Sequence, residues 1–205
     1  NEPGDRLITT INNPQLAGDH VVFPLNAGGG GRGRGQQQPP AEEAPRVTDE
    51  WDRYYSINVA AKNAKPVLLT TTDGLIENQD SIAISPDGRT FYYCTNANDI
   101  DRRHIWAVPV AGGTPRQVTT GAGIETFPTP LASGKLLATQ SADWRRPQSI
   151  GLWPLGASTS AQASQKWVFP TDAQLRSFPL DLHVEPQAVT TRAEDGREVY
   201  NQLFL

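Results

Sequence analysis

The chain has 205 residues, of which 37% are hydrophobic, and its 18 basic and 22 acidic residues give a net charge of −4. No apolar run reaches the roughly 18 to 20 residues that a membrane-spanning helix needs, and the basic excess typical of a nucleic-acid-binding surface is missing. We therefore expect neither a membrane span nor a nucleic-acid partner. The 18 glycines and 17 prolines favour many short strands joined by turns over long helices.

Residues 1–72 are predicted to form a first set of four strands, with a turn at Gly18-Asp19. Its expected strands are residues 7–11, 20–25, 54–59 and 66–71. Between the second and third of these lies an insertion at residues 27–49 that is rich in glycine, glutamine and proline. Such a composition offers little apolar surface to offset the entropy of ordering, so we predict a mobile loop.

Residues 73–120 and 121–180 repeat the same order of strands and turns. The expected strands are 81–85, 89–95, 104–110 and 115–120 in the first of these segments, and 124–131, 135–141, 149–155 and 165–170 in the second. The offset between them is steady: 46 positions from Gly88 to Gly134 and 45 from Ile105 to Ile150. This period is typical of one four-stranded blade of a β-propeller, which takes roughly 40 to 50 residues.

The last segment, residues 181–205, breaks the period. Strands at 184–192 and 198–205, joined by a turn at Asp195-Gly196, predict a hairpin of a different kind. Bulky apolar residues occupy both faces of its second strand: Val199, Leu203 and Leu205 on one face, and Tyr200 and Phe204 on the other. A strand that is apolar on both faces is typical of a sheet covered on each side, so we expect its partners to lie outside this chain.

Two stretches of the sequence resemble known families. Residues 84–89 (Ile-Ser-Pro-Asp-Gly-Arg), followed by an aromatic strand, and residues 105–113, followed by 115–119, resemble the blade motif of propellers in the TolB group and in the prolyl oligopeptidase family. The tail resembles the crossover from propeller to α/β-hydrolase domain in prolyl oligopeptidase family serine peptidases. The residues that carry this second resemblance are Pro186, Val189, Thr190, Asp195, Gly196, Val199 and 203–205.

Together, the repeat and the resemblance imply an all-β chain with about three four-stranded blades of a larger β-propeller, followed by the first hairpin of an α/β-hydrolase domain. The resemblance implies a parent serine exo- or oligopeptidase that acts on short peptides, with this segment gating access. Gly-x-Ser-x-Gly is absent from the sequence, so the Ser-His-Asp chemistry is expected on a hydrolase domain in the same protein or in a complementary chain. The alternative is a non-catalytic, TolB-like propeller that binds proteins. Neither a cofactor nor a compartment follows from the sequence.

The candidate substrate-facing residues lie in two equivalent places, residues 99–103 and 143–146, between the second and third strands of successive repeats. They are Arg102, Arg103, Arg145 and Arg146. A guanidinium group can hold a carboxylate of a substrate or of a facing domain through two parallel hydrogen bonds. The other interpretation is that each loop pairs its own Asp and Arg in solvent, where such a pair contributes roughly 0 to 1 kcal/mol.

The remaining chemistry-bearing residues favour structural roles. His20, His104 and His183 share no spacing and Cys94 is the only cysteine, so no metal site is predicted. Trp106 and Trp153 fall in the third strands of successive repeats, where we expect them in the core between stacked blades. Asp-Gly pairs at 87–88 and 195–196 are predicted to be turn residues.

Overall fold

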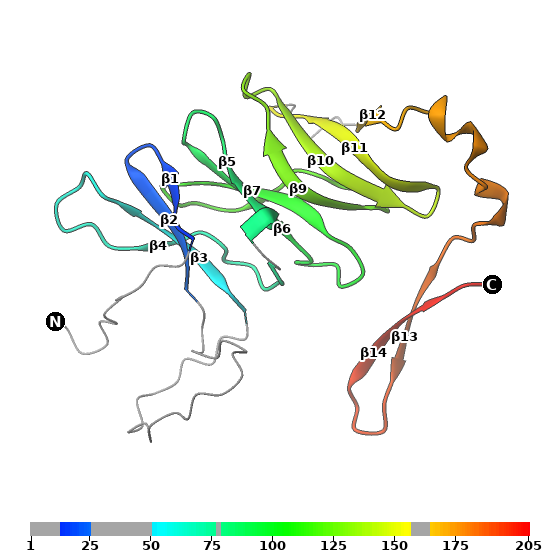
Figure 1. Ribbon diagram of the computed structural model, residues 1–205. Helices are drawn as coiled ribbons and strands as arrows, with labels where there is room; N and C mark the ends of the chain where they lie inside the picture. Colours follow the sequence, from blue (N-terminus) through cyan, green and yellow to red (C-terminus); the bar gives the residue numbers. More distant parts are fainter. Residues whose placement is uncertain (1–12, 26–50, 77–78, 157–164) are drawn as a thin grey trace, which may run out of the picture.

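The computed structural model describes residues 13–25, 51–76, 79–156 and 165–205 (Figure 1). These residues form three four-stranded antiparallel sheets, one two-stranded sheet and three short 3-10 helices, with no α-helix among them. The predicted all-β class is therefore confirmed. The insertion at residues 27–49 and the strand expected at residues 7–11 lie outside the described residues.

The first sheet has the strand order β1-β2-β3-β4. Its strands are β1 (Gln15–Ala17), β2 (His20–Leu25), β3 (Arg53–Asn58) and β4 (Val67–Leu68). Its first strand begins later than the sequence pattern indicated. Because Ala17 pairs with His20 across the two-residue turn at Gly18-Asp19, the strand that partners β2 must end directly before that turn.

The second sheet has the order β5-β6-β7-β8 and follows the predicted boundaries closely. It consists of β5 (Ile82–Ile84), β6 (Thr90–Thr95), β7 (His104–Pro109) and β8 (Arg116–Gln117), preceded by the 3-10 helix η1 (Gln79–Ser81). The turn between β5 and β6 contains Gly88 at φ +70°. Beside it, a hydrogen bond from Ser85 Oγ (2.6 Å) and another from the Arg89 amide lower the pKa of the Asp87 carboxyl. Asp87 and Gly88 are thus turn residues, as predicted.

The third sheet has the order β9-β10-β11-β12. Its strands are β9 (Ile124–Pro130), β10 (Leu136–Asp143), β11 (Arg146–Pro154) and β12 (Lys166–Phe169). The two central strands are longer than predicted, because Asp143 pairs with Arg146 across the residues Trp144 and Arg145. The stretch expected to be a loop is therefore a tight hairpin turn.

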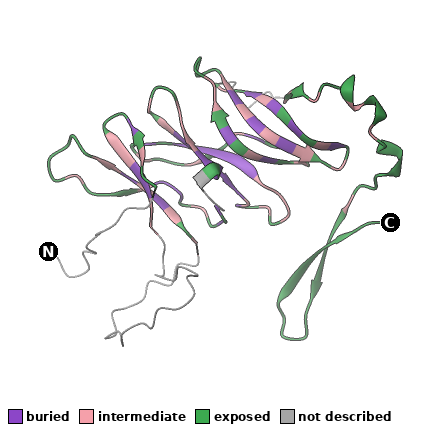
Figure 2. Cartoon of the chain, in the orientation of Figure 1, coloured by how far each residue is buried: buried purple, intermediate pink, exposed green. Residues whose placement is uncertain are grey.

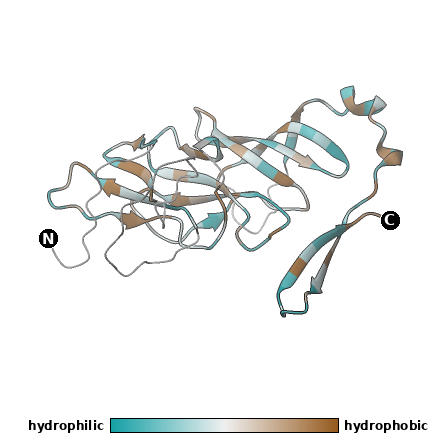
Figure 3. Cartoon of the chain, turned by 60° about the horizontal axis from the view of Figure 1, so that its bottom comes forward, coloured by the Kyte–Doolittle hydropathy of each residue, from teal (hydrophilic) through white to brown (hydrophobic). Residues whose placement is uncertain are grey.

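The three sheets are stacked face to face, with the second in the middle (Figure 1). Side chains of the first and second sheets form one buried cluster, which includes Val22, Tyr54, Leu69, Phe91, Tyr93, Trp106 and Val108. Side chains of the second and third sheets form another, which consists of Tyr92, Cys94, Ile105, Ala107, Leu137 and Trp153. Strands β6 and β7 of the middle sheet are buried at nearly every position, as a sheet covered on both faces requires, and Figure 3 shows hydrophobic residues in the strands of the stack. The predicted burial of the two tryptophans is confirmed.

Beyond β12, the chain leaves the stack. It passes through two short 3-10 helices, η2 (Gln174–Ser177) and η3 (Leu180–Leu182), and enters a hairpin of β13 (Gln187–Arg192) and β14 (Glu198–Leu203). Every residue of both strands is exposed, so the hairpin is uniformly green in Figure 2. Among the described residues, no helical segment combines the length and hydropathy of a bilayer crossing.

Candidate functional site

The candidate site lies on one rim of the stack. In a four-stranded antiparallel sheet, neighbouring strands run in opposite directions, so the second and fourth strands end at the same edge. The connection from the second to the third strand therefore lies beside the connection from the fourth strand to the next sheet. This brings together residues 96–103, residues 118–123 and the turn at Trp144-Arg145. The C-terminal hairpin approaches the same rim, where His183 Nδ1 lies 3.1 Å from the carbonyl oxygen of Trp144.

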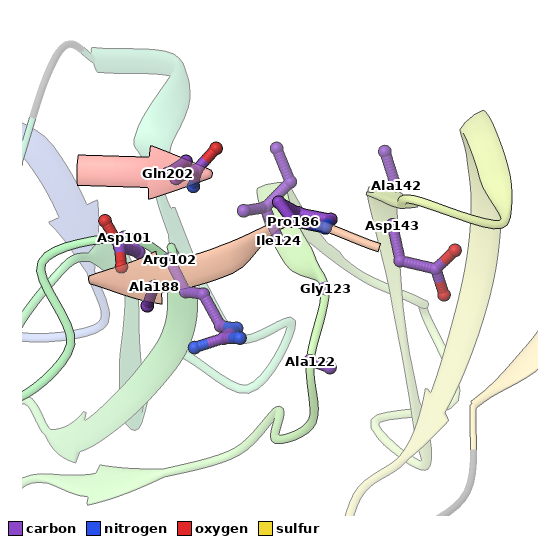
Figure 4. Close-up of a pocket in the computed structure, with 10 residues that line it drawn as sticks. All are labelled: Asp101, Arg102, Ala122, Gly123, Ile124, Ala142, Asp143, Pro186, Ala188 and Gln202. Carbon is purple, nitrogen blue, oxygen red and sulfur yellow. The ribbon is translucent and has the colours of Figure 1, made fainter. Parts of the chain in front are cut away.

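A hollow of about 270 Å³ separates this rim from the hairpin (Figure 4). It is lined by Asp101, Arg102, Ala122, Gly123, Ile124, Ala142, Asp143, Pro186, Ala188 and Gln202. Figure 4 shows Arg102 and Asp143 on opposite sides of Ile124, with β13 passing across the opening. The hollow therefore combines an apolar floor with one cation and two carboxylates.

Arg102 is half-buried and forms an ion pair with Asp99 in its own loop, with 3.0 Å between Nη1 and Oδ2. The second carboxylate oxygen of Asp99 accepts a hydrogen bond from the Asp101 amide at 3.1 Å, which fixes the loop. The interpretation that this loop pairs its own charges is thus correct for Arg102. A guanidinium has five N–H donors, and this ion pair engages one of its terminal nitrogens, so Arg102 retains donors on the side of the hollow.

The other arginines lie in different surroundings. Arg103 is half-buried, and its carbonyl accepts the amide of Glu125 at 2.8 Å, which joins the second sheet to the third. Arg145 is exposed at the hairpin turn, and its guanidinium carbon lies 4.5 Å from the centroid of the Trp144 ring. Of the two, Arg145 is the cation more open to a ligand.

Arg146 is buried and fully engaged inside the protein. Its Nη1 lies 2.7 Å from Asp172 Oδ1, its Nη2 donates to the Pro170 carbonyl, and its Nε donates to Ser149 Oγ at 3.2 Å. The guanidinium carbon also lies 4.3 Å from the centre of the Trp167 ring. These contacts tie the segment that follows β12 to β11, which is a positioning role for Arg146.

A second hollow, of about 440 Å³, adjoins the first and shares Ala122, Gly123, Ala142 and Asp143 with it. It is lined by Thr120, Gly121, Ala122, Gly123, Glu125, Ala142, Asp143, Trp153, Gln165 and Trp167. A chain of hydrogen bonds runs beside it: Gln165 Nε2 donates to Ser141 Oγ at 2.7 Å, and Ser141 Oγ lies 2.8 Å from Thr139 Oγ1. Thr139 Oγ1 accepts the Trp153 indole N–H at 3.1 Å. This hollow therefore has aromatic walls and fixed polar groups.

Sequence reasoning missed Glu125, the most buried charged group at this second hollow. Its Oε2 lies 2.7 Å from His104 Nδ1, and both side chains are buried. The two residues are 21 positions apart on different sheets, so no local pattern pairs them. Within the described part of the chain, no group of three or more His, Cys, Asp and Glu side chains is arranged to hold a metal ion.

The chain matches no protein-family model and no curated protein in the comparisons with known proteins. In the described part of the chain, the fold is all-β and consists of three stacked, four-stranded antiparallel sheets and a separate C-terminal hairpin.

Proposed function

We propose that the three sheets are consecutive blades of a β-propeller that controls access to a serine peptidase domain, as the resemblance to the prolyl oligopeptidase family implies. The observation that carries this proposal is the repetition of one strand order in three sheets that pack face to face. Radial repetition of four-stranded antiparallel sheets is the architecture of propeller blades. Acyl transfer by Ser, His and Asp would take place on the hydrolase domain, outside the described residues.

The C-terminal hairpin supports the part of the proposal that concerns the peptidase domain. Val199 and Leu203 are exposed on one face of β14, and Tyr200 is exposed on the other. An isolated two-stranded hairpin is marginally stable in water and needs further strands or a helix against it. A hairpin with apolar residues on both faces suits the start of an α/β-hydrolase sheet, which is covered on each side.

The rim hollow suggests how a short peptide would be held. Its volume of about 270 Å³ is suited to one end of a peptide, and Arg102 supplies hydrogen-bond donors for a carboxylate there. A peptide that reaches the hydrolase domain from the stack would pass between the rim and the hairpin. Arg102 and Arg145 are the two arginines that would meet it.

The coding sequence downstream of Leu205 tests the assignment to a peptidase. We expect alternating strands and helices with a Gly-x-Ser-x-Gly elbow, in which the serine is exposed on a sharp strand-to-helix turn. A return to the period of about 45 residues would instead favour the TolB-like binding platform. Labelling with a fluorophosphonate gives a second measure: the 205-residue chain should remain unlabelled, whereas the parent protein should be labelled on its catalytic serine.

In the parent protein, the Arg102→Ala variant tests the role of the rim. We expect the KM for short peptides with a free carboxylate to rise about tenfold, equivalent to ~1.4 kcal/mol, with little change in kcat. Arg116→Ala is the matched control, because it removes the same charge from an exposed position on the outer strand β8. Equal effects of the two variants would argue against a substrate-facing rim.

A further inference from the structure

The second hollow, of about 440 Å³, lies where the second and third sheets meet, and all four strands of the third sheet contribute to it. Trp153 belongs to the buried cluster shared by the two sheets, and Glu125 contacts His104 of the second sheet. The side chains that line the hollow from the third sheet are Glu125 on β9, Ala142 and Asp143 on β10, Trp153 on β11 and Trp167 on β12. Because paired strands hold the backbone of these residues, the hollow is preformed.

The donor groups of two lining side chains are already engaged within the protein. Gln165 lies across Gly151, where an added β-carbon would clash with it, so the glycine makes room for this side chain. Its Nε2 donates to Ser141 Oγ at 2.7 Å, and the Trp153 indole N–H donates to Thr139 Oγ1 at 3.1 Å. The side-chain carbonyl oxygen of Gln165 accepts no hydrogen bond from a described residue. These walls therefore offer a hydrogen-bond acceptor to a ligand.

Glu125 is the most buried charged group of the hollow. The residue is 3% exposed, and its Oε2 lies 2.7 Å from His104 Nδ1. No described residue donates a hydrogen bond to the other carboxylate oxygen, Oε1. A neutral histidine ring that donates its Nδ1–H leaves the negative charge on the carboxylate. Because a buried carboxylate oxygen without a donor is costly, Oε1 indicates a ligand that carries N–H groups.

The charges around the hollow favour a cation. Among its ten described lining residues, Glu125 and Asp143 carry carboxylates, and none is a lysine or an arginine. Asp143 is exposed, so it lies toward the open side of the hollow. Arg146, the cation stacked on Trp167, is neutralised by Asp172, with 2.7 Å between Nη1 and Oδ1. Indole walls add to the preference, because the electron-rich face of an aromatic ring attracts cations.

We propose that the second hollow binds an organic cation in which a guanidinium or ammonium group is attached to an aliphatic stem. The cationic group donates to Glu125 Oε1 and to Asp143, and the stem packs against Trp153 and Trp167. A guanidinium has five N–H donors and an ammonium has three, which suits a hollow lined by acceptors. The group belongs either to a free small molecule or to a basic side chain of a peptide, since both present the same chemistry. The proposal does not rest on the peptidase assignment.

The test is isothermal titration calorimetry of the 205-residue chain at about pH 8, above the ordinary histidine pKa of roughly 6.5. The probes are n-butylguanidinium, n-butylammonium and the uncharged analogue n-butylurea. We expect both cations to bind at least about tenfold more tightly than butylurea, because only they form charge-assisted hydrogen bonds with the carboxylates. N-acetylarginine amide separates the two sources: its binding indicates a peptide side chain, whereas binding of the butyl cations alone indicates a free small molecule.

Substitutions locate the bound cation. Glu125→Gln keeps the shape of the side chain and removes its charge, and the dissociation constant of butylguanidinium should rise at least about tenfold. Asp143→Asn should raise it by a smaller factor, because this carboxylate is exposed. Asp101→Asn is the matched control, since Asp101 lines the first hollow and not the second, and it should leave the affinity unchanged. Thermal unfolding shows whether each variant is folded.

Glu125→Gln also alters the contact with His104, so the comparison of Asp143→Asn with Asp101→Asn decides the matter if that variant does not fold. Equal binding of butylurea and butylguanidinium would overturn the proposal. So would an unchanged affinity in both Glu125→Gln and Asp143→Asn, or a loss in Asp101→Asn as large as in Asp143→Asn, which would place the cation in the first hollow. None of these measurements depends on peptidase activity, so that assignment succeeds or fails separately.

Discussion

His104 Nδ1 and Glu125 Oε2 lie 2.7 Å apart between the second and third sheets, and both side chains are almost completely buried. The backbone on either side reinforces this link, since the Glu125 amide donates to the Arg103 carbonyl and Cys94 Sγ lies 3.3 Å from the Glu125 carbonyl oxygen. The pair therefore fixes how the two sheets are aligned next to the second hollow.

Removing one member of this pair should destabilise the protein strongly. In Glu125→Ala, the His104 ring loses its hydrogen-bond partner in a buried position, and we expect the free energy of unfolding to fall by about 1–3 kcal/mol. Asp99→Ala is the control: it breaks the partly exposed pair with Arg102 and should cost roughly 0 to 1 kcal/mol. Urea unfolding followed by tryptophan fluorescence measures both. Similar losses in the two variants would contradict the structural importance of the buried pair.

The turns of neighbouring sheets approach closely at Gly88. A β-carbon added there would lie 2.8 Å from the backbone nitrogen of Gly18 in the first sheet, and the φ of Gly88 is +70°. Gly134 occupies the equivalent turn of the third sheet with φ +67°, but an added β-carbon would meet nothing within 4 Å. Gly134→Ala should thus cost only the conformational term of about 1–2 kcal/mol, whereas Gly88→Ala should cost at least about 1 kcal/mol more. Thermal unfolding compares the two, and equal losses would exclude a tight contact between the turns.

Alkaline pH should weaken the contact between the first and second sheets. Burial, together with the nearby charge of Asp52, raises the pKa of Tyr54 to about 12, and burial also raises the pKa of Tyr93. The unfolded chain releases its tyrosine protons near pH 10, whereas the folded protein still holds those of the two buried tyrosines. The contribution of these tyrosines to the free energy of unfolding is therefore fully present below about pH 10 and declines as the pH rises to about 12. Urea midpoints across this range should fall with pH, and the slope should be shallower in Tyr54→Phe. A midpoint independent of pH would contradict this.

Hydrogen exchange should separate the stack from the tail. Amides of β6 and β7 lie in the sheet that is covered on both faces, whereas β13 and β14 are exposed throughout and pair with each other. We expect exchange in β13 and β14 to be faster by several orders of magnitude, because local opening of an exposed hairpin requires little free energy. Slow exchange in β14 in a monomeric sample would show that the hairpin is covered in solution.

The sequence predicted those features that depend on short stretches of chain. The turns at Gly88 and Gly134 and most strands of the second and third sheets were recognised because turn residues and alternation are local signals. The burial of Trp153 followed from the steady repeat. The position of the first strand was missed, since the apolar residues 7–11 outweighed the short strand Gln15–Ala17 next to its turn.

The candidate site was harder to predict, because its contacts join distant parts of the chain. Arg146 was expected to face a substrate, but its guanidinium meets Asp172, 26 positions later in the sequence. The pairing of His104 with Glu125 depends on how two sheets are aligned, which neither strand encodes alone. For Arg102, which was a candidate substrate-facing residue, the alternative of a pair within its own loop could be recognised from the sequence, because Asp99 is only three residues away.

The order of the sheets along the chain also matters during synthesis. The first buried cluster needs Tyr54 from the first sheet and Val108 from the second, and these residues are 54 positions apart. At a translation rate of about 5–20 residues per second, the apolar face around Tyr54 waits roughly 3 to 11 seconds on the ribosome before its partner strand emerges. A chaperone would therefore be most useful after the first sheet has been synthesised and before the second has. Slower translation between β3 and β7 would lengthen the time for which the apolar face around Tyr54 is exposed.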